Sequence, residues 1–246
     1  MYGFRLIQVY KSFDGNQVLR GLNLSVKEGE KIIIIGGSGC GKSVTLKLLC
    51  GLLKPDSGKV FLWDAEVSAL SEEELVPIRR KVGMLFQSGA LFDSLTVFEN
   101  VAFPLRERGG YRESEIRQRV EEKLKAVGLP GVGHLFPAAL SGGMRKRVAL
   151  ARAIVMDPEI VFYDEPTTGL DPANAKRISL LIRKLHDDLG CTTCVVTHDM
   201  ACAKIIGGRY AFLANGVILV EGPMEEIERA EQEEVRAFLE YEGGRM

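Results

Sequence analysis

Residues Gly36 to Ser43 read Gly-Gly-Ser-Gly-Cys-Gly-Lys-Ser, which matches the phosphate-binding P-loop pattern G-x-x-x-x-G-K-S. Lys31 to Ile35, just before it, contains a run of isoleucines that is typical of a strand buried on both faces. Val44 to Leu49, just after it, has the apolar spacing of a helix. The pattern therefore predicts a turn between a buried strand and a helix, the context in which this motif binds phosphate.

The composition of the loop fits polyphosphate binding. Glycine leaves backbone N–H groups accessible at a helix N-terminus, where they bind anions. Lys42 supplies a positive charge for the β- and γ-phosphates, and the Ser43 hydroxyl is suited to ligate Mg²⁺. A dinucleotide-binding turn requires a third glycine where Lys42 stands, which argues against it. The residues expected to line the site are Gly36, Gly37, Ser38, Gly39, Cys40, Gly41, Lys42, Ser43 and Val44.

Length and charge limit the classes of protein to consider. The 246 residues fit one large α/β domain, or a domain with a smaller lobe, that can bury a sizeable core. The net charge of −1 provides no overall basic field for nucleic acid. The chain contains no apolar stretch long enough to span a membrane and does not start like a signal peptide, so we expect a cytosolic protein. Cys191 and Cys194 form a C-x-x-C pair that could be redox-active or half of a zinc site, but their β-branched surroundings favour buried thiols.

The order of the other segments predicts the architecture. Residues 4–9 and 22–26 are expected to form antiparallel strands joined by a turn at 13–16. Residues 97–157 indicate a helical lobe inserted into the α/β core, and residues 223–246 form an acidic, mostly helical tail. Such a tail could pack on a neighbouring subunit or cap its own domain. The predicted fold is a single α/β domain over residues 1–246, with a P-loop core, a parallel sheet, a small antiparallel β subdomain and a helical subdomain.

Two further stretches carry polar groups suited to the same chemistry. Ile160 to Glu165 reads as a buried strand that ends in two carboxylates, of which Asp164 can hold Mg²⁺ through water and Glu165 can polarise an attacking water. The alternative for this pair is a helix N-cap ahead of Pro166. Leu140 to Met144, with Ser-Gly-Gly at its centre, precedes a basic helix; it is either a flexible cap or a second backbone nest for a γ-phosphate held by another copy of the chain.

Taken together, these motifs resemble the ATP-binding subunit of an ABC transporter over essentially the whole chain. They follow the family's order: Walker A loop Gly36–Ser43, Q-loop Gln87, signature Leu140–Met144, Walker B Ile160–Asp164 with Glu165, D-loop Gly169–Asp171 and switch histidine His198.

The resemblance implies a homodimer in which each ATP lies between one subunit's Walker A loop and the other's signature loop. In this arrangement Phe13 stacks on adenine, although an ordinary core or surface phenylalanine is an equally good interpretation of Phe13 from the residues alone. The other implied roles are phosphate and Mg²⁺ binding by Lys42 and Ser43, completion of the metal shell by Gln87 and Asp164, base catalysis by Glu165, γ-phosphate contact by His198, action across the dimer by Ser141, Gly142 and Gly143, and an interface position for Asp171.

Met144 stands where the family usually has glutamine. This Ser-Gly-Gly-Met signature, with segments Leu85–Phe92 and Phe103–Arg106, resembles the ATPases of Mla-type systems, also described as toluene-tolerance or organic-solvent-resistance transporters. That resemblance implies an Mla-type permease, an MCE-domain lipid-binding protein and a STAS-domain regulator as partners, phospholipid as cargo, and a position on the cytoplasmic face of a bacterial inner membrane. Ser88 to Leu105 would then form the groove that receives the permease's coupling helix, or else a mobile surface loop.

Two rival classes remain from the sequence. Soluble ABC ATPases that act on DNA or ribosomes usually have two ATPase halves or a long coiled-coil or zinc insertion, and this chain has a single set of motifs without a heptad run. An unrelated P-loop kinase or GTPase would use the Ser-Gly-Gly stretch only as a helix cap and would turn over as a monomer.

Overall fold

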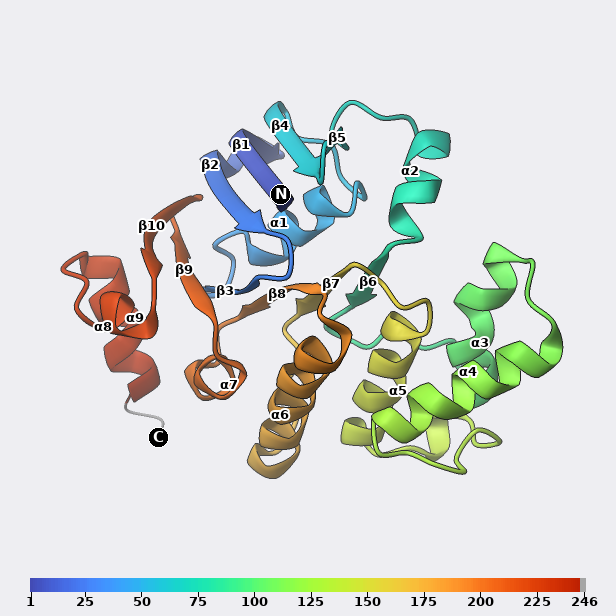
Figure 1. The fold of residues 1–246 in the computed structure, drawn as a ribbon. Coiled ribbons are helices and arrows are strands. Elements are labelled where there is room, and N and C mark those ends of the chain that lie inside the picture. The colour runs from blue at the N-terminus through green and yellow to red at the C-terminus, as the bar shows by residue number, and fades with distance from the viewer. Residues whose placement is uncertain (244–246) are drawn as a thin grey trace.

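A six-stranded sheet occupies the centre of the molecule, with strand order β10-β9-β3-β8-β7-β6 (Figure 1). The computed structural model describes residues 1–243. Within the sheet, β6 to β9 and β3 run parallel, whereas β10 is antiparallel to β9. The strands are β3 (Lys31–Ile35), β6 (Val82–Leu85), β7 (Ile160–Asp164), β8 (Thr192–Thr197), β9 (Arg209–Ala214) and β10 (Val217–Gly222).

A second, antiparallel sheet has the strand order β2-β1-β4-β5 and lies above the central sheet in Figure 1. Its strands are β1 (Tyr2–Phe13), β2 (Asn16–Lys27), β4 (Ser57–Leu62) and β5 (Ala65–Glu66). The first two are longer than the predicted 4–9 and 22–26. The register of β1 against β2 shifts between Leu6 and Val9, where Gln8 adopts a positive φ of 48°. Such a bulge interrupts the alternation of side chains from which a strand is predicted.

The isoleucines of β3 show how the two layers are held together. Ile32 and Ile34 belong to the core that includes the antiparallel sheet and α1 (Lys42–Leu49). Ile33 and Ile35 belong to the core formed with α5 (Gly142–Ile154), α6 (Pro172–Leu189) and α7 (Met200–Ile206). Because side chains alternate along a strand, one run of isoleucines serves both faces and fixes the P-loop between the layers.

Three α-helices and a short 3-10 helix lie between β5 and α5 in the sequence. Helix α2 (Glu72–Arg79) has Ser71 as its N-cap, and Ser71 and Glu74 form a capping box of reciprocal hydrogen bonds. The others are α3 (Val97–Arg108), α4 (Glu113–Ala126) and the short 3-10 helix η1 (Pro137–Ala139). With α5 they form the group of helices at the right of Figure 1. Among the described residues, no helix is both long and apolar enough to cross a bilayer.

The C-terminal helices α8 (Met224–Glu228) and α9 (Glu233–Gly243) pack on the chain's own sheet. Val235 is fully buried, and the Phe238 ring meets Phe212 of β9 edge to face with centroids 5.2 Å apart. Of the two positions considered for the tail, the structure shows the cap on its own domain; residues 244–246 of the predicted tail lie outside the described residues.

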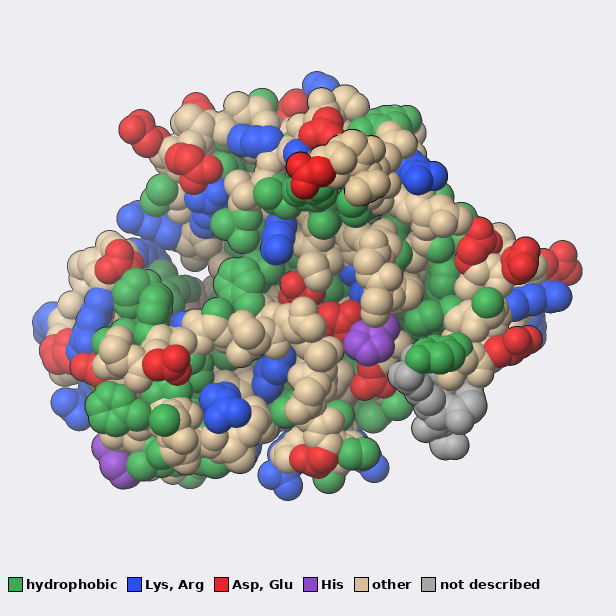
Figure 2. Space-filling model, turned by 180° about the vertical axis from the view of Figure 1, so that it is seen from behind, with side chains coloured by type: hydrophobic (Ala, Val, Ile, Leu, Met, Phe, Trp, Pro, Cys, Tyr) green, Lys and Arg blue, Asp and Glu red, His purple; other side chains and the backbone are tan. Residues whose placement is uncertain are grey.

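The distribution of surface charge and the burial of two cysteines can be compared with what the composition predicted. Acidic and basic side chains are interspersed over the face shown in Figure 2. Cys191 and Cys194 are free thiols within the core, and burial raises the pKa of both. The expectation of buried thiols is therefore confirmed.

Candidate active site

The P-loop joins β3 to α1, as predicted. Gly41 caps α1 with a φ of 108°, and a Cβ there would lie 2.7 Å from a methyl group of Leu19. A Cβ on Gly36 would lie 2.2 Å from the carbonyl oxygen of Leu213. These two positions exclude any side chain, so packing against β2 and β9 requires glycine there. Gly37, Ser38 and Gly39 are exposed and Cys40 and Val44 are half-buried, so the outer part of the loop faces solvent.

Lys42 lies over the loop that precedes it. Its Nζ donates hydrogen bonds of 2.9 Å to the carbonyl oxygens of Gly36 and of Gly37, and it lies 3.4 Å from Oε1 of Glu165. The lysine is only 5% exposed. A buried ammonium group held in this way places a fixed positive charge at the helix N-terminus, where the dipole also favours an anion.

Ser43 and Asp164 bring two oxygen ligands together. The Ser43 hydroxyl donates a 2.7 Å hydrogen bond to Oδ1 of Asp164, which ends β7 and is 5% exposed. Burial raises the pKa of Asp164, the hydrogen bond from Ser43 opposes this shift, and the charge of Glu165 adds to it. A hydroxyl and a carboxylate side by side are hard oxygen donors of the kind that Mg²⁺ takes, so these residues fit the predicted metal site.

Glu165 is the most constrained residue of the site. It has a positive φ of 45°, is 7% exposed, and its N–H donates to the carbonyl oxygen of Val196 at 3.0 Å. Its Oε2 lies 2.9 Å from Nδ1 of His198 and accepts a 3.3 Å hydrogen bond from Thr168. A left-handed conformation costs a non-glycine residue on the order of 1–3 kcal/mol and persists only where its surroundings fix it. Here it turns the carboxylate away from the strand toward Lys42 and His198.

The predicted signature residues lie away from this cluster, at the start of α5. Ser141 is the N-cap, and its Oγ accepts a 3.2 Å hydrogen bond from the N–H of Met144. The helix begins at Gly142, inside the stretch Leu140–Met144 that was expected to precede it, so Gly142 and Gly143 form its first turn rather than a loop. Ser141 is exposed, and a helix N-terminus presents unpaired N–H groups.

Asp171 lies next to that turn. It caps α6 and binds Asn174 through both carboxylate oxygens, at 3.0 Å to the backbone and 2.6 Å to the side chain. The backbone hydrogen bond, followed by that of the side chain, lowers the pKa of Asp171. A Cβ on Gly143 would lie 2.8 Å from Oδ1 of Asn174, and a Cβ on Gly142 would lie 3.5 Å from a methyl group of Leu170. The signature turn therefore packs directly on the D-loop and on the start of α6.

Gln87 and Phe13 are both exposed. Gln87 lies in the turn after β6, and its backbone carbonyl accepts a hydrogen bond from Lys146. Phe13 ends β1 and is 40% exposed, and Nζ of Lys11 lies 5.4 Å from the centroid of its ring. An exposed aromatic ring at the tip of a hairpin is available for stacking, which disfavours the core interpretation of Phe13.

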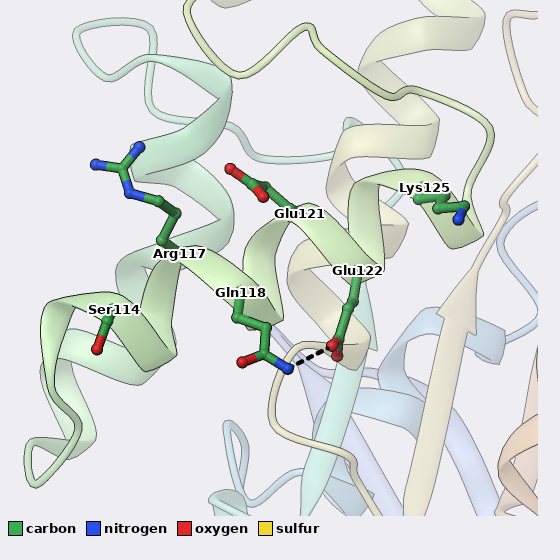
Figure 3. A pocket seen from close by; sticks show the side chains of 6 residues that line it. All are labelled: Ser114, Arg117, Gln118, Glu121, Glu122 and Lys125. Carbon is green, nitrogen blue, oxygen red and sulfur yellow. Dashed lines mark hydrogen bonds between the residues drawn. The ribbon is translucent and has the colours of Figure 1, made fainter.

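A pocket lies against the outer side of the P-loop, and the sequence did not predict all of its walls. Gly37 to Cys40 form one side together with residues of β2, while Glu234, Ala237, Phe238 and Tyr241 of α9 form another. The tail thus reaches the loop that precedes α1. A different hollow, shown in Figure 3, is lined only by side chains of α4, among them Gln118 and Glu122 joined by a 2.9 Å hydrogen bond, and contains none of the predicted site residues.

Lys146 is the functional candidate that the sequence analysis missed. It lies on α5 and is only 6% exposed, and its Nζ donates to the carbonyl oxygens of Gln87 and of Glu165. Burial lowers the pKa of Lys146, and the charges of Asp164 and Glu165 oppose this shift. A sequence signal existed: Lys146 shares a helical face with the buried residues Ala149, Leu150 and Ala153, where a lysine is unusual.

Comparisons with known proteins identify the family. The family model described as "ABC transporter" matches residues 19–168. The ATP-binding protein MlaF of the intermembrane phospholipid transport system of Haemophilus influenzae is 43% identical over 221 residues, 90% of this chain and 84% of its own. The probable ribonucleotide transport ATP-binding protein Mkl of Mycobacterium leprae is 42% identical over 93% of this chain. This chain spans only 66% of the length of Mkl.

Among solved structures, the dimeric ATP-binding cassette MJ0796, bound to ADP and phosphate in a post-hydrolysis state, superposes with a TM-score of 0.83. It shares 37% identity, over 90% of this chain and 98% of its own. These comparisons confirm the predicted fold class and enzyme class, and they confirm the resemblance to ABC cassettes and, among them, to the Mla type. The chain therefore belongs to the ABC transporter family and is an ATP-binding, ATP-hydrolysing cassette.

Proposed function

We propose that this chain drives a membrane permease as one of two identical ATPase subunits that close on ATP and open after hydrolysis. The observation that carries the proposal is the convergence of Lys42, Ser43, Asp164, Glu165 and His198 at the carboxyl edge of the parallel sheet. This edge is where ligands bind in open α/β sheets.

Each residue has a distinct task in the proposed reaction. Lys42 binds the β- and γ-phosphates, and Ser43, Asp164 and the side chain of Gln87 hold Mg²⁺, which neutralises charge on the phosphates when bound. Glu165 orients and polarises the attacking water. His198, hydrogen-bonded to Glu165, contacts the γ-phosphate. The protein's contribution is mostly positioning and charge stabilisation.

A second copy completes the site. Ser141, Gly142 and Gly143 are at the end of a helix whose N-terminus suits a γ-phosphate, and we propose that they act on the nucleotide of the partner, with Asp171 at the interface. Phe13 stacks on the adenine from its own subunit. The dimeric, ADP- and phosphate-bound neighbour MJ0796 supports this arrangement, because it shares the fold over nearly its whole length.

An apolar groove offers a place for the permease. It has a volume of about 660 Å³. Its lining includes Ala90, Phe92, Phe103 and Pro104, which belong to the segment 88–105 that was expected to form such a groove. The rings of Phe92 and Phe103 have centroids 4.9 Å apart and are 44% and 37% exposed. Val76 and Arg79 of α2 and Met156 also line it. Apolar walls with charged residues at the rim suit an amphipathic helix, such as a permease's coupling helix.

The proposed cargo is phospholipid, moved by an Mla-type permease together with an MCE-domain lipid-binding protein and a STAS-domain regulator at the bacterial inner membrane. The support is the similarity to MlaF, which covers most of both chains. The name of the mycobacterial relative indicates a different cargo at nearly the same identity. In the proposed system the permease, rather than the ATPase, contacts the cargo.

The proposal is tested by affinity purification of the tagged chain from mild-detergent extracts of its native membranes, with mass spectrometry of proteins and lipids. A permease with an MCE-domain protein and bound phospholipid is expected. A different permease would retain the transporter ATPase and reject the lipid. Ribosomal or DNA partners without a permease would favour the soluble class of ABC ATPases.

A further inference from the structure

Lys146 is a buried cation whose charge is directed at main-chain groups rather than at a carboxylate. Its Nζ contacts the carbonyl oxygen of Gln87 and, at 3.4 Å, that of Glu165. These residues follow the neighbouring strands β6 and β7 and are the proposed metal-shell and base residues. One ammonium group thus joins the two loops that carry the reaction.

The contact matters most at Glu165, whose backbone is left-handed. The peptide group on one side of Glu165 is held by the hydrogen bond from its N–H to Val196, and the one on the other side by Lys146. If either hydrogen bond is removed, the backbone of Glu165 can leave its left-handed conformation, which is unfavourable without support. The side chain would then no longer be directed at Lys42 and His198.

The same helix holds the rest of the loop after β6. Arg152, also on α5, donates 2.7 Å hydrogen bonds to the carbonyl oxygens of Gly89 and of Ala90. Both Ala90 and Arg152 line the proposed permease groove, and Ser141 is the N-cap of α5. Helix α5 therefore links the groove, the loop of Gln87, the peptide group of Glu165 and the signature turn.

We propose that Lys146 is a positioning residue for ATP hydrolysis, which fixes the main chain of Gln87 against that of Glu165 and so aims the Glu165 carboxylate. The proposal rests on the roles given above to those two residues. A residue with this role affects the chemical step while leaving nucleotide binding at the P-loop intact.

The test compares purified Lys146→Met, which keeps the length of the side chain and removes its donors, with Lys146→Arg, which keeps charge and donors. Lys125→Met is the control, because Lys125 is an exposed lysine of α4 (Figure 3). We expect Lys146→Met to lower kcat about 10²-fold, the cost typical of a small misplacement, with little change in KM or in the affinity for a fluorescent ATP analogue. Lys146→Arg should restore most of the activity, and Lys125→Met should match the wild type.

A second readout does not depend on turnover. In hydrogen exchange followed by mass spectrometry, Lys146→Met should speed exchange in residues 86–92 and 164–170 and leave the P-loop helix unchanged. If Lys146→Met does not fold, Lys146→Leu takes its place with the same expectations, because it also removes the donors and the charge from a mostly buried side chain. Wild-type kcat and exchange in the neutral variant would overturn the proposal, as would equal losses of kcat, ATP affinity and melting temperature, which would indicate a purely structural role.

Glu165→Gln is measured in parallel. If Glu165→Gln hydrolyses ATP normally, the assignment of the base fails. If Glu165→Gln is inactive and Lys146→Met is not, only the positioning role fails.

Discussion

Nδ1 of His198 lies 2.9 Å from Oε2 of Glu165, although the two residues are 33 positions apart in the chain. They are brought together because β7 and β8 are parallel neighbours, so the residues after each strand meet at the same edge. The pair places an imidazole and a carboxylate beside the P-loop lysine, since Oε1 of Glu165 lies 3.4 Å from Nζ of Lys42.

His198→Ala should lower ATP turnover by about 10²-fold, within the range for loss of a group that acts on the transferred proton or phosphoryl group, and should leave ATP binding nearly unchanged. Phosphate release measures the turnover, and nucleotide titration measures ATP binding. His186→Ala is the matched control, because His186 contacts Thr193 at the amino end of β8, the end of the sheet away from the P-loop turn, and is not one of the proposed site residues. Wild-type turnover in His198→Ala would contradict the assigned role.

Ser141→Arg should nearly abolish hydrolysis, because bulk and charge at the first turn of α5 would prevent a second copy from closing on ATP. The substitution also removes a helix cap, which costs about 1 kcal/mol of stability. Ser71→Arg separates the two effects: Ser71 caps α2 by accepting a 3.3 Å hydrogen bond from the N–H of Glu74, much as Ser141 caps α5 by accepting a 3.2 Å hydrogen bond from the N–H of Met144. Equal turnover in the two variants would argue against a site formed across a dimer.

Much of the site could be predicted because its residues stand at the ends of strands, where short motifs determine both position and chemistry. The run of isoleucines, the glycines after it, and the carboxylates at the end of β7 each mark one edge of one sheet. The packing of β3 against both layers could also be predicted, because side chains alternate between the two faces of a strand.

The residues that were missed act through tertiary contacts that have no local pattern. Lys146 binds carbonyl groups 59 and 19 positions away, and any residue type can supply a carbonyl. The wall that α9 adds to the P-loop pocket depends on where the tail turns back on β9 and β10. The bulge at Gln8 shortened the predicted β1 for a similar reason, since it is set by pairing with β2 rather than by the sequence of β1 alone.

Phe13→Ala should weaken ATP binding by about 10-fold, since stacking of a base on an aromatic side chain contributes about 1–3 kcal/mol. Phe13→Tyr should bind as the wild type does, because it keeps the ring. Titration with a fluorescent ATP analogue gives both affinities. If the alanine variant binds as tightly as the tyrosine variant, adenine does not rest on Phe13, and the exposed ring serves another purpose.

Phe103→Asp should abolish co-purification of the permease while the chain still binds ATP. The substitution places a charge in the apolar wall that Phe103 forms with Phe92, where a docked helix would have to desolvate it. Phe136→Asp is the control, because Phe136 is a similarly exposed phenylalanine (49%, against 37% for Phe103) outside the groove. Retention of the permease by Phe103→Asp would exclude this groove as its docking site.

Asp164→Asn should abolish Mg²⁺-dependent hydrolysis and yet leave the nucleotide-free chain at least as stable as the wild type at pH 7. Burial raises the pKa of Asp164 above its ordinary value of 3.8. The stability associated with a raised carboxyl pKa is present below that ordinary value and is lost as the pH rises through the folded-state pKa, where the buried group must ionise. Asparagine cannot ionise, so the melting temperature of Asp164→Asn should equal or exceed that of the wild type at pH 7. The difference between the two melting temperatures should shrink toward pH 4.

Asp56→Asn should show the opposite sign. The hydrogen bonds from Lys11 and then Ser12 lower the pKa of Asp56, so its contribution to stability is present above the ordinary value of 3.8 and is lost as the pH falls through the folded-state pKa. Its asparagine variant should therefore melt below the wild type at pH 7 and approach it in acid. Melting curves of the wild type and the two asparagine variants between pH 4 and pH 8 distinguish a carboxyl group whose ionisation burial opposes from one whose ionised form a lysine stabilises. Destabilisation of Asp164→Asn at pH 7 would mean that the Ser43 hydrogen bond outweighs burial, and that the site is organised by its own contacts rather than completed by Mg²⁺.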